Sequence, residues 1–125
     1  TKQYHTKRYR ARVASTTPIS PSSVSSFLDQ KMAVVQMTPF RVEKRRSMKE
    51  RPHWVVLEKV TPVDETHVDI ILHASAGCYI KEFISGDAGR TTPSFSSWIN
   101  STCVCEELDV VEIVEANEFT FEPAT

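Results

Sequence analysis

The residue types best suited to chemistry gather in one segment, residues 75–91. It contains all three glycines of the chain, at positions 77, 86 and 89. Glycine reaches backbone angles that are closed to other residues and lets other groups approach closely, so this clustering indicates a backbone shaped for one site. The same segment carries a phenol ring at Tyr79, a cation at Lys81 and an acid at Asp87.

The second feature is a division of charge that the net value of −1 conceals. Residues 1–52 hold twelve Lys and Arg against three acids, whereas residues 53–125 hold three against thirteen. The arginines of the first half form two clusters, which are Arg8, Arg10 and Arg12, and Arg41, Arg45 and Arg46. A basic face of this kind predicts contacts with the phosphates of a polyanion such as RNA. The alternative is that the two halves pair with each other, and charge alone leaves both readings open.

Composition narrows the class of protein. A chain of 125 residues with 40% apolar residues corresponds to one domain or part of one, and its first residue, Thr1, suggests a processed or excised piece. No apolar run approaches the roughly 18 residues of a membrane helix, and no secretory signal pattern is present. Three cysteines fit an intracellular protein, in nucleus or cytoplasm. Cys103, Cys105 and His73 lack the second cysteine pair of a structural zinc site, so no metal is expected.

The first half of the chain predicts two strands and a helix. Residues 4–14 alternate, with Tyr9 on one side and Arg8 and Arg10 on the other, as in a strand with one basic face. Ser20 and Pro21 are typical of a helix start, and the apolar spacing after them predicts a short helix to about residue 32. Residues 34–37 read as a further strand.

The second half predicts a hairpin, two short helices and a last strand. The hairpin joins residues 54–60 to 67–74 through a turn at 62–65, with a break at Pro52 before it. A short helix follows Gly77, another runs from Thr92-Pro93 to Asn100, and a strand covers residues 108–114 before an acidic tail, 115–125, that is expected to fray. Strands with short helices and no regular βαβ alternation indicate an α+β fold with a mixed or mostly antiparallel sheet.

Three motifs resemble those of the Pus-ten family of pseudouridine synthases. The segment GCYIKEF (77–83), continuing to GDAGRT (86–91), resembles the family's G-T-Y-I-K-E-F and G-D-x-G-R-T. The segment TPFRVEKRR (38–46) resembles its T-P-x-R-V-x-x-R-R, and LDV (108–110) its L-D-V. KRYR (7–10) also resembles a strand of the broader TruB-like class.

The resemblance implies the C-terminal part, residues 1–125, of the catalytic domain of an enzyme that isomerises uridine to pseudouridine in tRNA, in the TΨC arm, without a cofactor. The target base must leave its stack, and aromatic rings commonly receive such a base. Tyr9 matches the tyrosine that packs against the base and Tyr79 the second active-site tyrosine, with Ile80 and Trp98 as further substrate contacts. Lys81 matches the cation that holds the catalytic carboxylate ionised.

Other residues are assigned to the shape of the loop or depart from the family. The expected loop-shaping residues are Gly77, Gly86, Asp87, Gly89 and Arg90. Cys78 replaces the family's Thr, and Trp98 stands where the class has a Leu under the uracil. Trp98 therefore either stacks on the base or turns into the core.

The catalytic aspartate of the family precedes the KRYR strand, and no Asp of this chain lies in that context. The chain alone is therefore expected to be inactive, to require upstream domains of a parent chain, and to self-associate if excised. The alternative is a non-catalytic RNA-binding module with the same fold.

Overall fold

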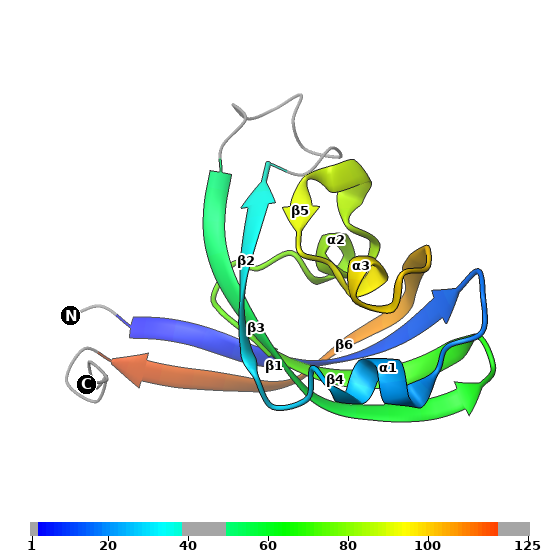
Figure 1. The fold of residues 1–125 in the computed structure, drawn as a ribbon. Coiled ribbons are helices and arrows are strands. Elements are labelled where there is room, and N and C mark those ends of the chain that lie inside the picture. Colours follow the sequence, from blue (N-terminus) through cyan, green and yellow to red (C-terminus); the bar gives the residue numbers. More distant parts are fainter. Residues whose placement is uncertain (1–2, 39–49, 118–125) are drawn as a thin grey trace.

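The computed structural model describes residues 3–38 and 50–117, which form a six-stranded sheet with three short α-helices on one face (Figure 1). The strands are β1 (Gln3–Ser15), β2 (Lys31–Met37), β3 (Glu50–Asp64), β4 (His67–Ala74), β5 (Thr91–Thr92) and β6 (Cys103–Asn117). The helices are α1 (Pro21–Ser25), α2 (Ile80–Ser85) and α3 (Phe95–Ile99), with a 3-10 turn, η2 (Asp87–Gly89). The strand order is β5-β2-β3-β4-β1-β6, and neighbouring strands pair antiparallel. The predicted α+β class with a mostly antiparallel sheet is confirmed.

Strand β1 lies between β4 and β6 and shows the predicted alternation. Tyr9, Ala11 and Val13 are buried under the helices. Arg8 and Arg10 point to the opposite face, where they are only partly covered. Side chains alternate between the two faces of a strand. The same stretch of sequence therefore gives β1 one buried apolar face and one basic face.

The β3–β4 hairpin is longer and tighter than predicted. Asp64 pairs with His67, so the turn is Glu65–Thr66 rather than residues 62–65. Pro52 does not break the strand; it lies in β3 opposite Val35 of β2. Proline is tolerated there because β4 pairs with β3 only from Val55 onwards, so no neighbour on that side requires the missing N–H.

The helices that follow Gly77 and Pro93 are present as α2 and α3, and Asn100 ends α3 in the left-handed conformation (φ 55°). The first helix is a correction, since α1 ends at Ser25 instead of continuing to residue 32. Asp29 takes a positive φ of 60°, and Lys31 and Met32 already pair with β3. Strand pairing thus overrides the helical spacing of the apolar residues. Strand β6 starts at Cys103, five residues before the prediction, and extends to Asn117 within the tail that was expected to fray.

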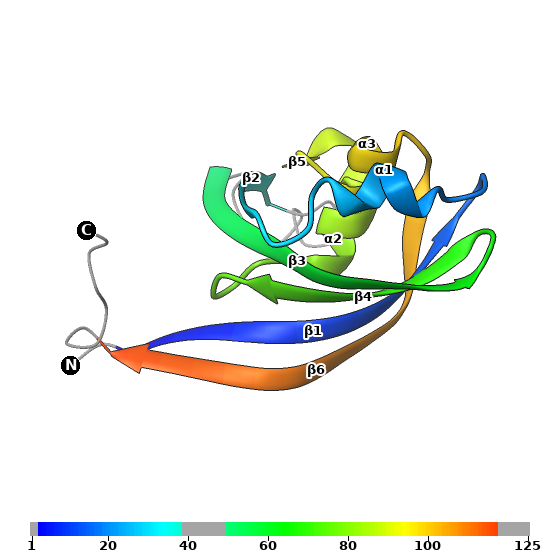
Figure 2. The same ribbon diagram turned by 60° about the horizontal axis from the view of Figure 1, so that its bottom comes forward.

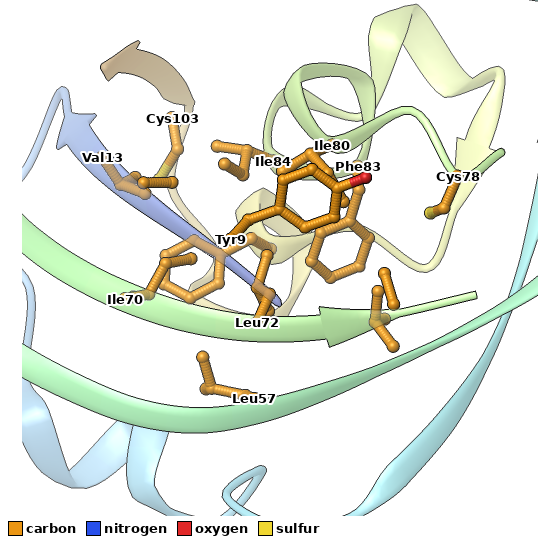
Figure 3. Packing of buried hydrophobic residues seen from close by; sticks show 14 of the residues in the cluster. Tyr9, Val13, Leu57, Ile70, Leu72, Cys78, Ile80, Phe83, Ile84 and Cys103 are labelled. Carbon is orange, nitrogen blue, oxygen red and sulfur yellow. The ribbon is translucent and has the colours of Figure 1, made fainter. Parts of the chain in front are cut away.

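The core lies between the sheet and the helices (Figure 3). Its largest fully buried side chains include Phe83 of α2, Phe95 of α3 and Leu57, Ile70 and Leu72 of the sheet. Figure 2 shows the β1–β6 pair continuing beyond the helices as a two-stranded arm. None of the helices described is long and apolar enough to span a membrane.

Candidate active site

A cavity of about 440 Å³ opens between β1, β6 and the start of α2. Its lining comes from three separate parts of the sequence and contains two phenol rings, an ammonium group and a carboxylate. The lining residues are Tyr9, Cys78, Tyr79, Ile80, Lys81, Glu82 and Leu108. The fold therefore brings Tyr9 to Tyr79, Ile80 and Lys81, which the motifs singled out about 70 residues further along the chain.

A tight turn directs the chain from β4 into this cavity. The N–H of Cys78 donates to the carbonyl of Ser75 at 3.2 Å, and Gly77 has a φ of +79°. A positive φ at the third position of such a turn is reached without strain only by glycine or asparagine. The hydroxyl of Ser75 also accepts the N–H of Trp54 at 3.1 Å, which ties the turn to β3.

Helix α2 then places the cation. Tyr79 caps its start in an extended conformation (φ −86°, ψ 108°), and the helix runs from Ile80. Ile80 and Phe83 are buried in the core, whereas Lys81 is exposed at the mouth of the cavity. Glu82 is buried with only 7% of its surface exposed, and among the described residues it is the only acid that lines the cavity.

Tyr9 forms the floor of the cavity from the centre of β1. Its ring is 9% exposed, lies between the sheet and α2, and points its hydroxyl away from the sheet (Figure 3). Burial raises the pKa of the Tyr9 phenol, and the nearby Cys78 sulfur adds to that rise. The hydroxyl is therefore protonated at neutral pH, and the ring offers a flat apolar surface with a polar edge.

Cys78 occupies the place where the related motif has a threonine. Burial, and then the charge of Glu82, raise the pKa of the Cys78 thiol to about 12. A thiol with this pKa is protonated at neutral pH and is therefore a poor nucleophile. Cys78 therefore contributes shape to the cavity and no charge.

The loop after α2 carries the other two glycines. Gly86 ends the helix with a φ of +87°, and its N–H donates to the carbonyl of Glu82 at 2.7 Å. Asp87 and Gly89 also have positive φ values, of 46° and 89°, and the N–H of Arg90 donates to the carbonyl of Asp87 at 3.0 Å. Neither Asp87 nor Arg90 lines the cavity, so in this structure both belong to the loop that returns the chain to the sheet.

Trp98 lies away from the cavity. Its ring stacks on Phe27 at 4.6 Å between centroids and meets Phe83 and Phe95 edge-on at 5.2 and 6.1 Å. This geometry favours the alternative in which Trp98 belongs to the core. The cavity lining instead contains two aliphatic side chains among the described residues, Ile80 of α2 and Leu108 of β6.

The three arginines of β1 face away from the cavity and are ion-paired. Arg8 contacts Glu58 at 3.0 Å and Glu112 at 2.8 Å, which lie on either side of β1. The remaining pairs join Arg10 to Asp69, Glu107 and Asp109, and Arg12 to Asp69. For β1, the structure therefore favours the reading in which the basic first half pairs with the acidic second half. Arg41, Arg45 and Arg46 lie outside the described residues.

Motif reasoning assigned no role to three residues that line the cavity, Cys78, Glu82 and Leu108. Each lies inside a motif that had been noted, Leu108 in LDV and Glu82 directly after Lys81. The signal was therefore available, but the contact between β6 and α2 that turns it into a site depends on tertiary structure.

The chain is similar in sequence to known proteins of one family. The family model described as "Pus10, C-terminal" matches residues 1–114. The chain is 41% identical over 116 residues to the tRNA pseudouridine synthase Pus10 of Methanocaldococcus jannaschii. This aligned region covers 90% of this chain and 25% of that protein. It is 37% identical over 109 residues to the human protein of the same name, covering 86% of this chain and 21% of that protein. The chain thus spans about a quarter of these relatives, and it belongs to the Pus10 C-terminal family.

Proposed function

We propose that this chain is the C-terminal portion of the catalytic domain of a tRNA pseudouridine synthase, an isomerase that converts uridine to pseudouridine. The observation that carries the proposal is the cavity in which Tyr9, Tyr79 and Lys81 meet, although 70 residues separate the two tyrosines in the sequence. Its relatives in Methanocaldococcus jannaschii and human are named for this activity.

Each side chain has a role that follows from its position. The uridine must leave its stack before its glycosidic bond can be broken, and the Tyr9 ring at the cavity floor offers a surface for the extruded base. Tyr79 lies on the wall beside it, and Ile80 adds apolar contact. Lys81, exposed at the mouth, is placed to pair with a carboxylate arriving from outside and to hold it ionised.

The proposal requires that carboxylate to come from another part of the protein. Among the described residues, no aspartate lines the cavity. Glu82 contributes to the lining, but it is buried. Residues upstream of this chain in a parent protein would supply the catalytic aspartate and cover the open side of the cavity. Residues 1–125 alone are then expected to show no turnover.

The apolar surface of β6 supports such a partner. Val110, Val111 and Ile113 are each more than half exposed, with 51, 53 and 58% of their surface accessible. Strand β6 is at the edge of the sheet and pairs only with β1 among the described strands. A long, apolar edge strand is an open pairing site, and we propose that the upstream half of the catalytic domain occupies it.

We propose that Arg41, Arg45 and Arg46 contact the phosphates of the RNA, in preference to the arginines of β1. Any phosphate bound at Arg8, Arg10 or Arg12 has to compete with the carboxylates that already hold these groups. These arginines also lie on the face of the sheet opposite the cavity. RNA that places a base on Tyr9 would have to pass around the β6 edge to reach them.

The test is tritium release from tRNA labelled at uridine C5, with the complete reading frame that contains these 125 residues. We expect turnover by the wild type, and a loss on the order of 100-fold or more in kcat for Lys81→Gln because the carboxylate loses its counter-ion. Lys59→Gln is the matched control, since Lys59 is an exposed lysine on β3, and this variant should retain activity. Salt-dependent tRNA binding without any tritium release would instead indicate an RNA-binding module that has kept the fold and lost the catalysis.

A further inference from the structure

The side chain of Gln36, on β2, is buried behind the candidate active site with 1% of its surface exposed. Its Oε1 accepts the backbone N–H of Tyr79 at 2.9 Å, and its Nε2 donates to the backbone carbonyl of Tyr79 at 2.8 Å. The same Nε2 lies 3.3 Å from the hydroxyl of Thr91. One amide therefore bonds both backbone polar groups of Tyr79, and the Tyr79 carbonyl also accepts the N–H of Phe83 at 3.0 Å.

The backbone around Gln36 holds the other end of the same segment. Gln36 pairs with Thr91 in the β2–β5 ladder, and the N–H of Met37 donates to the carbonyl of Arg90 at 2.7 Å. The side chain thus fixes the chain at Tyr79 while the main chain fixes it at residues 90–91. The segment between these points contains α2 and the glycine loop, and both of its ends are hydrogen-bonded to β2.

Tyr79 is the residue where this matters most. It precedes α2 with no side-chain cap; the helix holds its carbonyl through the N–H of Phe83, whereas Gln36 holds its N–H. Holding its N–H and its carbonyl fixes the direction in which the Tyr79 ring leaves the backbone. It also sets where α2 begins, and therefore where Lys81, two residues later, reaches the cavity mouth.

We propose that Gln36 is a positioning residue for Tyr79 and Lys81, an inference that rests on the proposed function for its effect on catalysis. Gln36 does not line the cavity, so it acts only through these two residues. A misplacement of about 1 Å in a reacting group is enough to lower turnover on the order of 100-fold.

The first test is Gln36→Met in the complete reading frame, which keeps the volume and removes all three hydrogen bonds. We expect kcat for tritium release to fall about 10- to 100-fold, with the KM for tRNA changed by less than about threefold, because Gln36 does not line the cavity. Val34→Ala is the control, since Val34 is buried on the same strand and the same face and its truncation leaves a void. Both variants are compared below their melting temperatures.

The second test is Gln36→Glu, which distinguishes positioning from general stability. A protonated carboxyl has the shape of the amide and can both accept the Tyr79 N–H and donate to its carbonyl. Ionised, it would repel that carbonyl. The ratio of the kcat of this variant to that of the wild type should therefore rise as pH falls, and burial brings this titration toward neutral pH.

A third readout does not need activity. In hydrogen exchange of the same protein, peptides containing Tyr79 should exchange about tenfold faster in Gln36→Met than in the wild type. Unchanged exchange and unchanged kcat in that variant would overturn the inference, as would an equal loss of kcat in Val34→Ala. If the wild type itself released no tritium, the proposed function would fail, while faster exchange at Tyr79 would still establish that Gln36 holds it.

Discussion

Cys78 shows how strongly single residues of the cavity are controlled by their surroundings. Its thiol lies beside two tyrosines and a lysine, in the kind of place where a reactive cysteine is often found. Burial nevertheless holds its pKa at about 12, and the buried Glu82 next to it acts in the same direction. Cys78 thus adds shape to the cavity lining, and its thiol stays protonated at neutral pH.

The raised pKa of the Cys78 thiol predicts how its reactivity changes with pH. With a pKa of about 12, the thiolate fraction of Cys78 at pH 8 is on the order of one in ten thousand, because each pH unit below the pKa lowers it tenfold. Iodoacetamide should therefore modify native Cys78 very slowly at pH 8, with a rate that still rises tenfold per unit up to at least pH 10. Peptide mass spectrometry measures this rate. Cys105, which is less buried, should react first; a Cys78 rate that levels off below pH 9 would contradict the assignment.

At the scale of elements, the loop between α2 and α3 depends on two glycines that differ in one respect. Gly86 and Gly89 have nearly equal φ values, +87° and +89°. A Cβ on Gly89 would meet nothing within 4 Å, whereas a Cβ on Gly86 would lie 3.2 Å from the Ser94 hydroxyl. That hydroxyl accepts the N–H of Ser97 in the capping box that begins α3. Gly86 therefore connects the end of one helix to the start of the next.

Alanine substitutions separate the two effects. Gly89→Ala should lower the free energy of unfolding by about 1 kcal/mol, which is the backbone strain of a left-handed alanine. Gly86→Ala has the same strain and also displaces the Ser94 cap, so we expect a loss of about 2–3 kcal/mol. Urea denaturation of both variants gives the comparison. Equal losses would mean that the Ser94 contact has no energetic weight.

The elements also show what sequence could and could not supply. The alternation in β1 and the start and stop signals of α3 are local, and they predicted those elements correctly. The predicted length of α1 and the predicted break at Pro52 were wrong, because the pairing between β2 and β3 decides both. In the site, Tyr79 and Lys81 were visible as a motif, but Gln36 was not. A glutamine in a short strand becomes informative only when its partner 43 residues away is known.

At the scale of the whole molecule, the described part of the chain has an uneven surface. Four of its six exposed large apolar side chains lie on β6, namely Val104, Val110, Val111 and Ile113. Ion pairs that join β1 to both neighbours cover the face of these strands that carries Arg8, Arg10 and Arg12. The edge of β6 is thus the place where a second polypeptide segment can bury apolar area.

Excised residues 1–125 should therefore associate with themselves when nothing else occupies that edge. Light scattering is expected to show a mass above that of the monomer that increases with concentration. Replacing Val111 and Ile113 together by Lys should shift the protein toward monomer, because charges on an edge strand oppose pairing. Val63→Lys is the control, an equally apolar and 45% exposed site on the hairpin away from β6. A monomer at high concentration with a cooperative melt would contradict the expectation.

The position of β1 between β4 and β6 has a consequence for how this chain folds during synthesis. Tyr9 is made before its partners, because its strand pairs with residues 67–74 and 103–117, which follow it in the chain. Contacts so distant in sequence close slowly, and an early strand must wait for its partners to leave the ribosome. The β2–β3–β4 meander can form before that point, with β1 still unpaired. The cavity is then completed only when Leu108 of β6 joins its lining, so it is among the last features of this chain to form.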